Sequence, residues 1–144
     1  MKRNLLILIF ILPLIVHGQL TDNFSDGNFT SNPAWSGDAS QFIVNASQQL
    51  QLQSSGTAVS SLSVSNNMAS LDSTEWSFYI RENFSPSSAN YGRVYLVSDQ
   101  SNLEGSLNGY YLQFGEAGSI DAVGLFKQQD STSTLICHAL YESE

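Results

Sequence analysis

The chain has 144 residues, of which 42% are hydrophobic and 12% charged, with 5 Lys and Arg against 13 Asp and Glu and a formal net charge of -8. That length is room for one domain, and the acidic balance works against nucleic acid or anionic lipid as partners, since phosphates need a cationic face. The 24 Ser residues and the 11% aromatic content indicate a polar chain that folds, because disordered segments lack aromatic residues.

The first eighteen residues have the three-part layout of a secretory signal peptide. Lys2 and Arg3 form a basic start, an apolar run extends from Leu5 to Val16, and Gly18 precedes the expected cleavage site. The run is shorter than the roughly 20 residues of a membrane span and contains a proline, so we expect a chain that does not span a membrane. We expect an exported protein, secreted or at the cell surface, whose single domain covers residues 19–144.

Cys137 is the one cysteine of the chain, which excludes an intrachain disulfide and leaves the fold to depend on its core. Its neighbour His138 is the one histidine after residue 18. Successive residues of a strand face opposite sides, so the two do not form a nucleophile and base. A lone histidine also argues against zinc. We expect Cys137 to be a small core residue.

Short stretches of alternating apolar and polar residues recur after residue 19, with hardly any helical spacing. Turn-forming Gly, Asn, Pro and Ser residues separate them. The expected strands are 42–44, 50–52, 59–64, 75–84, 93–97, 110–114, 123–126 and 135–137, and 67–73 is expected to be a crossing loop. In strand 75–84, Trp76, Phe78 and Ile80 share one face, and Trp76 is expected in the core. Such strands, without helices to cover a parallel sheet, predict an all-β fold with two antiparallel sheets packed as a sandwich.

Two parts of the chain carry a family resemblance. The sequence DNFSDGNF from Asp22, followed by NPAWSG from Asn32, resembles the opening of concanavalin A-like β-sandwich modules of the laminin-G type. The later sequences GYYLQFG from Gly109 and LFK from Leu125 are similar to the paired central strands of such modules. The nearest resemblance is to the N-terminal sandwich of secreted surface proteins of the Bacteroidetes, which a lamin-tail domain or a type nine secretion sorting tail often follows.

The resemblance covers roughly residues 22–139 and implies a jelly-roll of two antiparallel sheets. It implies no single activity, because this fold hosts lectins, glucanases and spacer domains alike. Laminin-G-like modules tend to be longer than residues 19–144, so we expect a fragment of a longer protein, truncated at the C-terminus.

A glycosidase active site is one possibility on a fold of this kind. A retaining glycosidase needs two carboxylates about 5 to 5.5 Å apart, and laminarinase-type glucanases carry their acidic residues on one strand. The nearest stretch, 119–124, holds Asp121 but has Ser and Gly in place of the glutamates, so Asp121 is interpreted as a turn residue. Glu75 and Glu82 fall on opposite faces of their strand. We therefore expect no catalytic residues.

Two acidic loops are candidates for Ca²⁺, which takes six to eight oxygen ligands. The first holds Asp22 and Asp26, and the second holds Asp99 and Glu104 with Asn102 between them. The second does not follow the spacing of an EF-hand loop. The alternative is that these side chains only stabilise turns, and both interpretations remain open.

Sugar binding uses an exposed aromatic ring flanked by amide or carboxylate groups. Trp35 and Tyr91 are the aromatic residues least committed to a strand, and Tyr111 faces away from its neighbours Tyr110 and Leu112, where it can line a concave sheet. Asn102 supplies an amide. For Trp35 the alternative is a ring folded onto the edge of a sheet.

The leading hypothesis is an exported, non-catalytic β-sandwich module that binds a carbohydrate or mediates adhesion at a bacterial cell surface. Ca²⁺ is the one cofactor considered, as an ion that orders the loops. The second hypothesis is a structural spacer or N-terminal module of a larger protein, without a ligand of its own. The third is a fragment of a glycoside hydrolase that lacks its acid pair.

Overall fold

The computed structural model describes residues 19–66, 70–72, 74–115 and 122–139. Over these residues the fold is all-β: every strand pair is antiparallel, and helical structure is limited to one short 3-10 turn, η1 (Ala39–Gln41). None of the helical structure in these ranges is long and apolar enough to cross a membrane. The expected signal peptide, Asp121 and most of the expected crossing loop lie outside the described residues.

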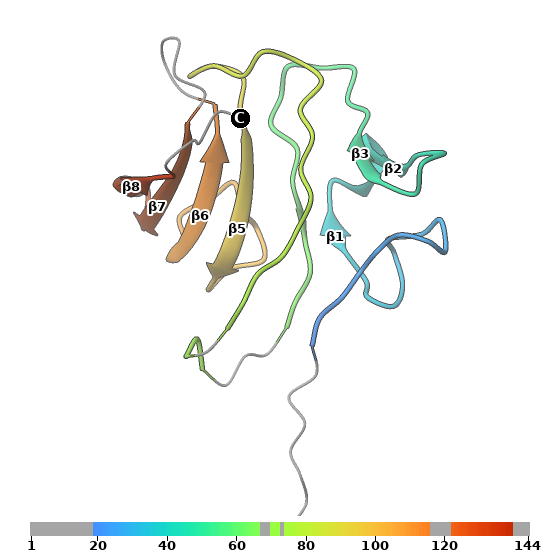
Figure 1. Ribbon diagram of the computed structural model, residues 1–144, viewed down its shortest axis with the longest axis horizontal. Coiled ribbons are helices and arrows are strands. Elements are labelled where there is room, and N and C mark those ends of the chain that lie inside the picture. The colour runs from blue at the N-terminus through green and yellow to red at the C-terminus, as the bar shows by residue number, and fades with distance from the viewer. Residues whose placement is uncertain (1–18, 67–69, 73, 116–121, 140–144) are drawn as a thin grey trace, which may run out of the picture.

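Four strands that follow one another in the chain form the largest sheet, in the order β5-β6-β7-β8. The strands are β5 (Gly92–Ser98), β6 (Gly109–Phe114), β7 (Val123–Gln129) and β8 (Thr132–His138). Figure 1 shows this sheet on one side of the molecule, with β5 nearest the remaining chain and β8 outermost. The four predicted strands in this region are confirmed, and each extends further than its alternating pattern.

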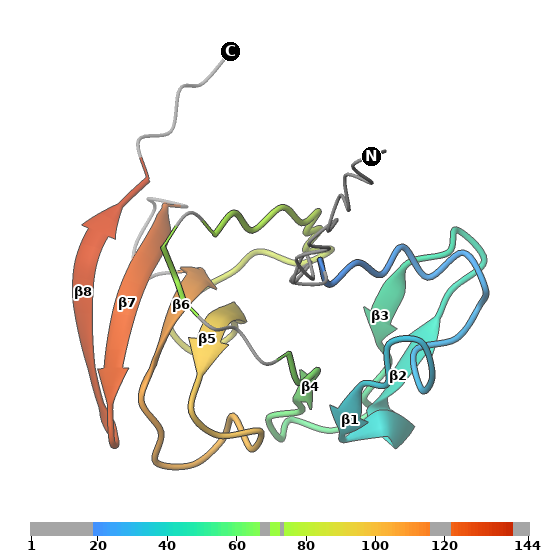
Figure 2. The same cartoon turned by 90° about the horizontal axis from the view of Figure 1, so that it is seen from below.

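Two smaller ladders lie on the other side of the molecule (Figure 2). One pairs β1 (Ser36–Gly37) with β4 (Leu62–Ser63), and the other pairs β2 (Phe42–Val44) with β3 (Leu50–Leu52). The bounds of β2 and β3 agree with the predicted strands. Only two residues of predicted strand 59–64 are paired, and β1 was not predicted.

The predicted strand 75–84 is wrong, because this segment joins no ladder. Trp76 is 40% exposed, so the prediction that it is a core residue is also wrong, and its companions Phe78 and Ile80 are 42% and 37% exposed. The Phe78 ring nevertheless meets the edge of Phe114 on β6, with 6.4 Å between centroids. The alternation gives the segment one apolar face, but a strand also needs a neighbouring backbone edge to pair with.

The two faces of the four-stranded sheet differ in chemistry. Tyr95, Tyr111 and Phe126 stand in register on one face, with centroids 5.0 Å and 5.2 Å apart along the row. Tyr111 is only 1% exposed, whereas Tyr110, its neighbour on the opposite face, is 37% exposed. Tyr111 does face away from Tyr110, as predicted, but adjoining rings cover it, so it offers no open face to a sugar.

The outermost strand, β8, is exposed along its whole length. Cys137 lies in it and is an exposed free thiol, so the prediction of a core cysteine is wrong. The physical reason is its place in the fold: in the described part of the chain β8 has a neighbouring strand, β7, on one side only. A residue of an edge strand lacks the second neighbour that would bury it.

Candidate functional site

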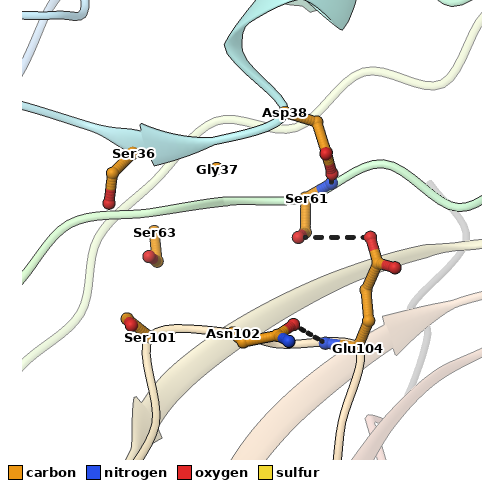
Figure 3. Close-up of a pocket in the computed structure, with 8 residues that line it drawn as sticks. All are labelled: Ser36, Gly37, Asp38, Ser61, Ser63, Ser101, Asn102 and Glu104. Carbon is orange, nitrogen blue, oxygen red and sulfur yellow. Dashed lines mark hydrogen bonds between the residues drawn. The ribbon is translucent and has the colours of Figure 1, made fainter.

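A hollow of about 420 Å³ lies between the β1–β4 ladder and the loop that joins β5 to β6. The residues that line it are polar, apart from one glycine. The lining residues are Ser36, Gly37, Asp38, Ser61, Ser63, Ser101, Asn102 and Glu104 (Figure 3). Four hydroxyls, one amide and two carboxylates therefore meet in one place, although they come from three separate parts of the chain.

One wall of the hollow is the β1–β4 ladder. Asp38 and Ser61 are joined twice: the Asp38 N–H donates to the Ser61 carbonyl at 2.9 Å, and the Ser61 N–H donates to Asp38 Oδ2 at 2.9 Å. Gly37 has φ of 131°, and a Cβ at this position would overlap the Ser61 carbonyl oxygen. Glycine is thus the residue that lets the two strands approach so closely, and this approach places Asp38 and Ser61 beside the hollow.

The opposite wall is the loop between Ser98 and Gly109. Its two ends are tied together, because the Asn108 N–H and side-chain amide donate to the two Asp99 carboxylate oxygens at 2.7 and 2.8 Å. Within the loop, the Glu104 N–H donates to Asn102 Oδ1 at 3.0 Å. These bonds fix a compact turn from which the Glu104 side chain reaches toward Ser61 of the first wall (Figure 3).

The loop is also anchored from below by a buried polar network. Gln128, 7% exposed, donates from Nε2 to the Gly105 and Asp130 carbonyls at 3.3 and 2.9 Å. The Tyr95 hydroxyl donates to Gln128 Oε1 at 2.6 Å. Leu107, 2% exposed, fills the underside and donates its N–H to the Asp130 carbonyl at 3.2 Å. The network holds the loop on the sheet and so supports the position of the hollow.

The two walls touch at one end of the hollow. The Ser61 hydroxyl donates to Glu104 Oε1 at 3.4 Å, a long and therefore weak hydrogen bond between exposed groups. Figure 3 shows the Asp38, Ser61 and Glu104 side chains on this side and the Ser36, Ser63 and Ser101 side chains on the other. Because the closing bond is weak, a ligand hydroxyl can replace it at little cost.

Two ionisable groups that hold the loop have shifted pKa values. The N–H and amide of Asn108 stabilise the charged carboxylate and hold the pKa of Asp99 below its ordinary value of 3.8. Burial raises the pKa of Tyr95 above its ordinary 10.0, against the smaller lowering effect of the Arg93 charge. At neutral pH Asp99 is therefore an acceptor for Asn108, and the Tyr95 hydroxyl remains a donor to Gln128.

The predicted metal ligands of the second acidic loop separate into two roles. Asn102 and Glu104 both line the hollow, whereas the Asp99 carboxylate accepts hydrogen bonds from Asn108 at the base of the loop. Nowhere in the described ranges do three or more His, Cys, Asp or Glu side chains form a group that could hold a metal ion.

The predicted ligands of the first acidic loop accept hydrogen bonds within their turns, and Asp22 also accepts one from the more distant Trp35. Asp22 accepts from the Phe24 N–H at 2.9 Å and from Trp35 Nε1 at 2.8 Å. Asp26 accepts from the Asn28 N–H at 3.0 Å. These contacts support the alternative interpretation, in which both carboxylates stabilise turns.

The predicted aromatic residues lie outside the lining of the hollow. The Trp35 ring N–H donates a hydrogen bond to Asp22, and the centroid of the Trp35 ring lies 6.1 Å from that of Phe24. Tyr91 is 39% exposed and carries the guanidinium of Arg93 over its ring at 4.8 Å. The structure thus brings the predicted amide and carboxylate of the loop together in the hollow, and it places the predicted rings elsewhere.

Sequence reasoning missed the remaining members of the lining: Ser36, Gly37, Asp38, Ser61, Ser63 and Ser101. The serines give no signal, because serine is the commonest polar residue of the chain. Gly37 followed by Asp38 is a turn signal, but it does not reveal which distant segment lies opposite.

No family model, curated protein or solved structure matches this chain. A functional assignment therefore depends on the chemistry of the hollow.

Proposed function

We propose that this protein is an exported, non-catalytic β-sandwich module that binds a carbohydrate in the hollow between the β1–β4 ladder and the β5–β6 loop. The observation that carries the proposal is the lining itself, which offers hydroxyl, amide and carboxylate groups around about 420 Å³. Small-molecule sites occupy about 300–1,000 Å³ but are mostly apolar. A polar lining of this size suits a ligand that is covered with hydroxyl groups.

The lining groups match the hydrogen-bonding needs of a sugar. The carboxylates of Asp38 and Glu104 accept hydrogen bonds from sugar hydroxyls, while Asn102 donates to the sugar from Nδ2, since its Oδ1 already accepts from the Glu104 N–H. The serine hydroxyls turn to suit either role. Two carboxylates in the hollow of an acidic chain disfavour anionic ligands, so the ligand class is a neutral or amino sugar.

The same proposal includes the fold. We infer a jelly-roll sandwich related to the laminin-G-type modules of Bacteroidetes surface proteins. The antiparallel strands and the near absence of helix in the described ranges support it. Export and a place at the cell surface are supported by the layout of residues 1–18. In such a setting the hollow serves adhesion to surface or extracellular glycans.

A glycan array probed with the purified full chain tests the proposal, once with Ca²⁺ and once with EDTA. We expect binding to neutral or amino sugars that EDTA leaves unchanged, because the hydrogen bonds are made directly. Glu104→Gln should weaken this binding, whereas Glu75→Gln, the same charge change at an exposed residue away from the hollow, should not. A folded protein that binds no glycan would favour a spacer without a ligand, and loss of binding in EDTA would contradict a site without metal.

A further inference from the structure

The face of the sheet that carries Tyr111 also holds an arginine between two aromatic rings. Arg93 lies in β5, and its Cζ is 4.8 Å from the centroid of Tyr91 and 4.7 Å from that of Tyr111. Arg93 is exposed, as is 39% of Tyr91, whereas Tyr111 is buried. One ring thus forms the floor under the guanidinium, and the other forms a wall that reaches solvent.

The orientation of this guanidinium is fixed by the neighbouring strand. Arg93 stands opposite Gln113 in the β5–β6 register, and its Nε–H donates to Gln113 Oε1 at 3.0 Å. Gln113 in turn donates from Nε2 to the Gly115 carbonyl at 3.1 Å, which determines which end of the amide meets Arg93. A guanidinium has five N–H donors. Among the described residues, Gln113 takes the Nε–H and the Tyr95 hydroxyl also interacts with the guanidinium, so terminal N–H donors remain for pairing with a carboxylate.

The electrostatic surroundings also single out this cation. Arg81, Arg93 and Lys127 are the basic residues after residue 18, in a chain of net charge -8. The Glu82 carboxylate lies where a Cβ of Gly92 would point, and successive strand residues face opposite sides, so it lies across the sheet from the Arg93 side chain. Among the described residues, the titratable side chains that interact directly with Arg93 are the tyrosines 91, 95 and 111, none of which is a carboxylate.

We propose that Arg93, Tyr91 and Gln113 form a second binding site, which takes the carboxylate of an acidic sugar such as a uronic acid. The carboxylate pairs with the terminal NH₂ groups of Arg93, and the sugar ring contacts the exposed part of Tyr91. Because the rings and Gln113 hold the guanidinium in place before binding, less side-chain freedom is lost when the ligand arrives. This site is separate from the hollow and does not depend on the function proposed there.

The test is an NMR titration of the purified ¹⁵N-labelled full chain, followed through the arginine Nε–H signals, with glucuronate, glucose and acetate as probes. We expect glucuronate to shift the Arg93 signal saturably and to bind about tenfold or more tightly than either glucose or acetate. Equal effects of glucuronate and glucose would overturn the role of Arg93. Equal affinities for glucuronate and acetate would overturn the sugar assignment.

Three variants separate this site from a general charge effect. Arg93→Lys keeps the charge but loses the planar fork, and it should weaken glucuronate binding about tenfold. Gln113→Glu places a carboxylate opposite Arg93 without removing a strand contact, and it should abolish glucuronate binding in a protein that still folds. Arg81→Gln removes one positive charge at another position and should leave glucuronate binding unchanged. Binding that survives Gln113→Glu, or that Arg81→Gln removes, contradicts the proposal.

Discussion

Asp99 and Asn108 are joined by three hydrogen bonds across the base of the β5–β6 loop. The Asp99 N–H donates to the Asn108 carbonyl at 3.0 Å, and both Asp99 carboxylate oxygens accept from Asn108 at 2.7 and 2.8 Å. The pair closes the loop that carries Ser101, Asn102 and Glu104 into the hollow. Although Asp99 lies outside the hollow, it determines the positions of three of the seven polar side chains that line it.

Replacing Asp99 should therefore impair binding more than folding. Asp99→Ala removes two acceptors at the base of the loop, so the loop must be ordered when the sugar binds, and we expect affinity for the sugar to fall about tenfold. Far-UV circular dichroism should show an unchanged β fold. Asp72→Ala, which removes an exposed carboxylate outside the loop, is the control, and equal losses in both variants would contradict this role of Asp99.

The same pair predicts a pH dependence. The pKa of Asp99 is lowered below 3.8 in the folded protein, so its contribution to stability is fully present above pH 3.8 and is lost as the pH falls through the lower folded-state pKa. Thermal unfolding of the wild type and of Asp99→Asn, followed from pH 7 to pH 2, measures this effect. The difference between the two melting temperatures should be constant at higher pH and shrink below pH 3.8. A difference that grows at low pH would contradict the assignment.

Gly37 should tolerate no side chain. A Cβ there would overlap the Ser61 carbonyl, and the φ of 131° is strained for any other residue. We expect Gly37→Ala to lower the free energy of unfolding by about 1–3 kcal/mol and to weaken sugar binding by separating Asp38 from Ser61. Gly56→Ala, where an added Cβ would make only ordinary contacts at 3.9 Å, should change stability by less than about 0.5 kcal/mol. Urea unfolding of both variants decides the matter.

The hydroxyl of Tyr95 should matter for stability while that of Tyr110 should not. Tyr95→Phe leaves Gln128 Oε1 without its donor at a residue that is 7% exposed, which costs about 1–3 kcal/mol. Tyr110→Phe removes a hydroxyl from a residue that is 37% exposed on the opposite face and should cost less than about 0.5 kcal/mol. Equal unfolding free energies for the two variants would show that the network under the loop does not support the fold.

The strands of the four-stranded sheet were predictable because their signals are local. Alternation in 110–114 and the turn residues between neighbouring strands suffice when consecutive strands pair with each other. Segment 75–84 has the same alternation yet joins no ladder, because pairing depends on an available edge that the segment itself does not encode. Cys137 was misplaced for a related reason, since its exposure follows from the outermost position of β8.

The sequence predicted one wall of the candidate site and missed the other. Asn102 and Glu104 were expected because amide and carboxylate groups in an acidic loop are typical ligands. The other wall depends on β1 and β4, which are two residues each and lie far apart in the chain. Pairings so short and so distant leave no periodic pattern to read, and Asp38 and Ser61 could be found only in the folded protein.

Filling the hollow is the most direct test that it binds sugar. Ser101→Trp places a large ring in the hollow, and Gln100→Trp adds the same ring at the neighbouring exposed position outside the lining. Probed on one glycan array, the wild type and Gln100→Trp should bind the same neutral or amino sugars, and Ser101→Trp should lose them while remaining folded by circular dichroism. Sugar binding that persists unchanged in Ser101→Trp would contradict the account.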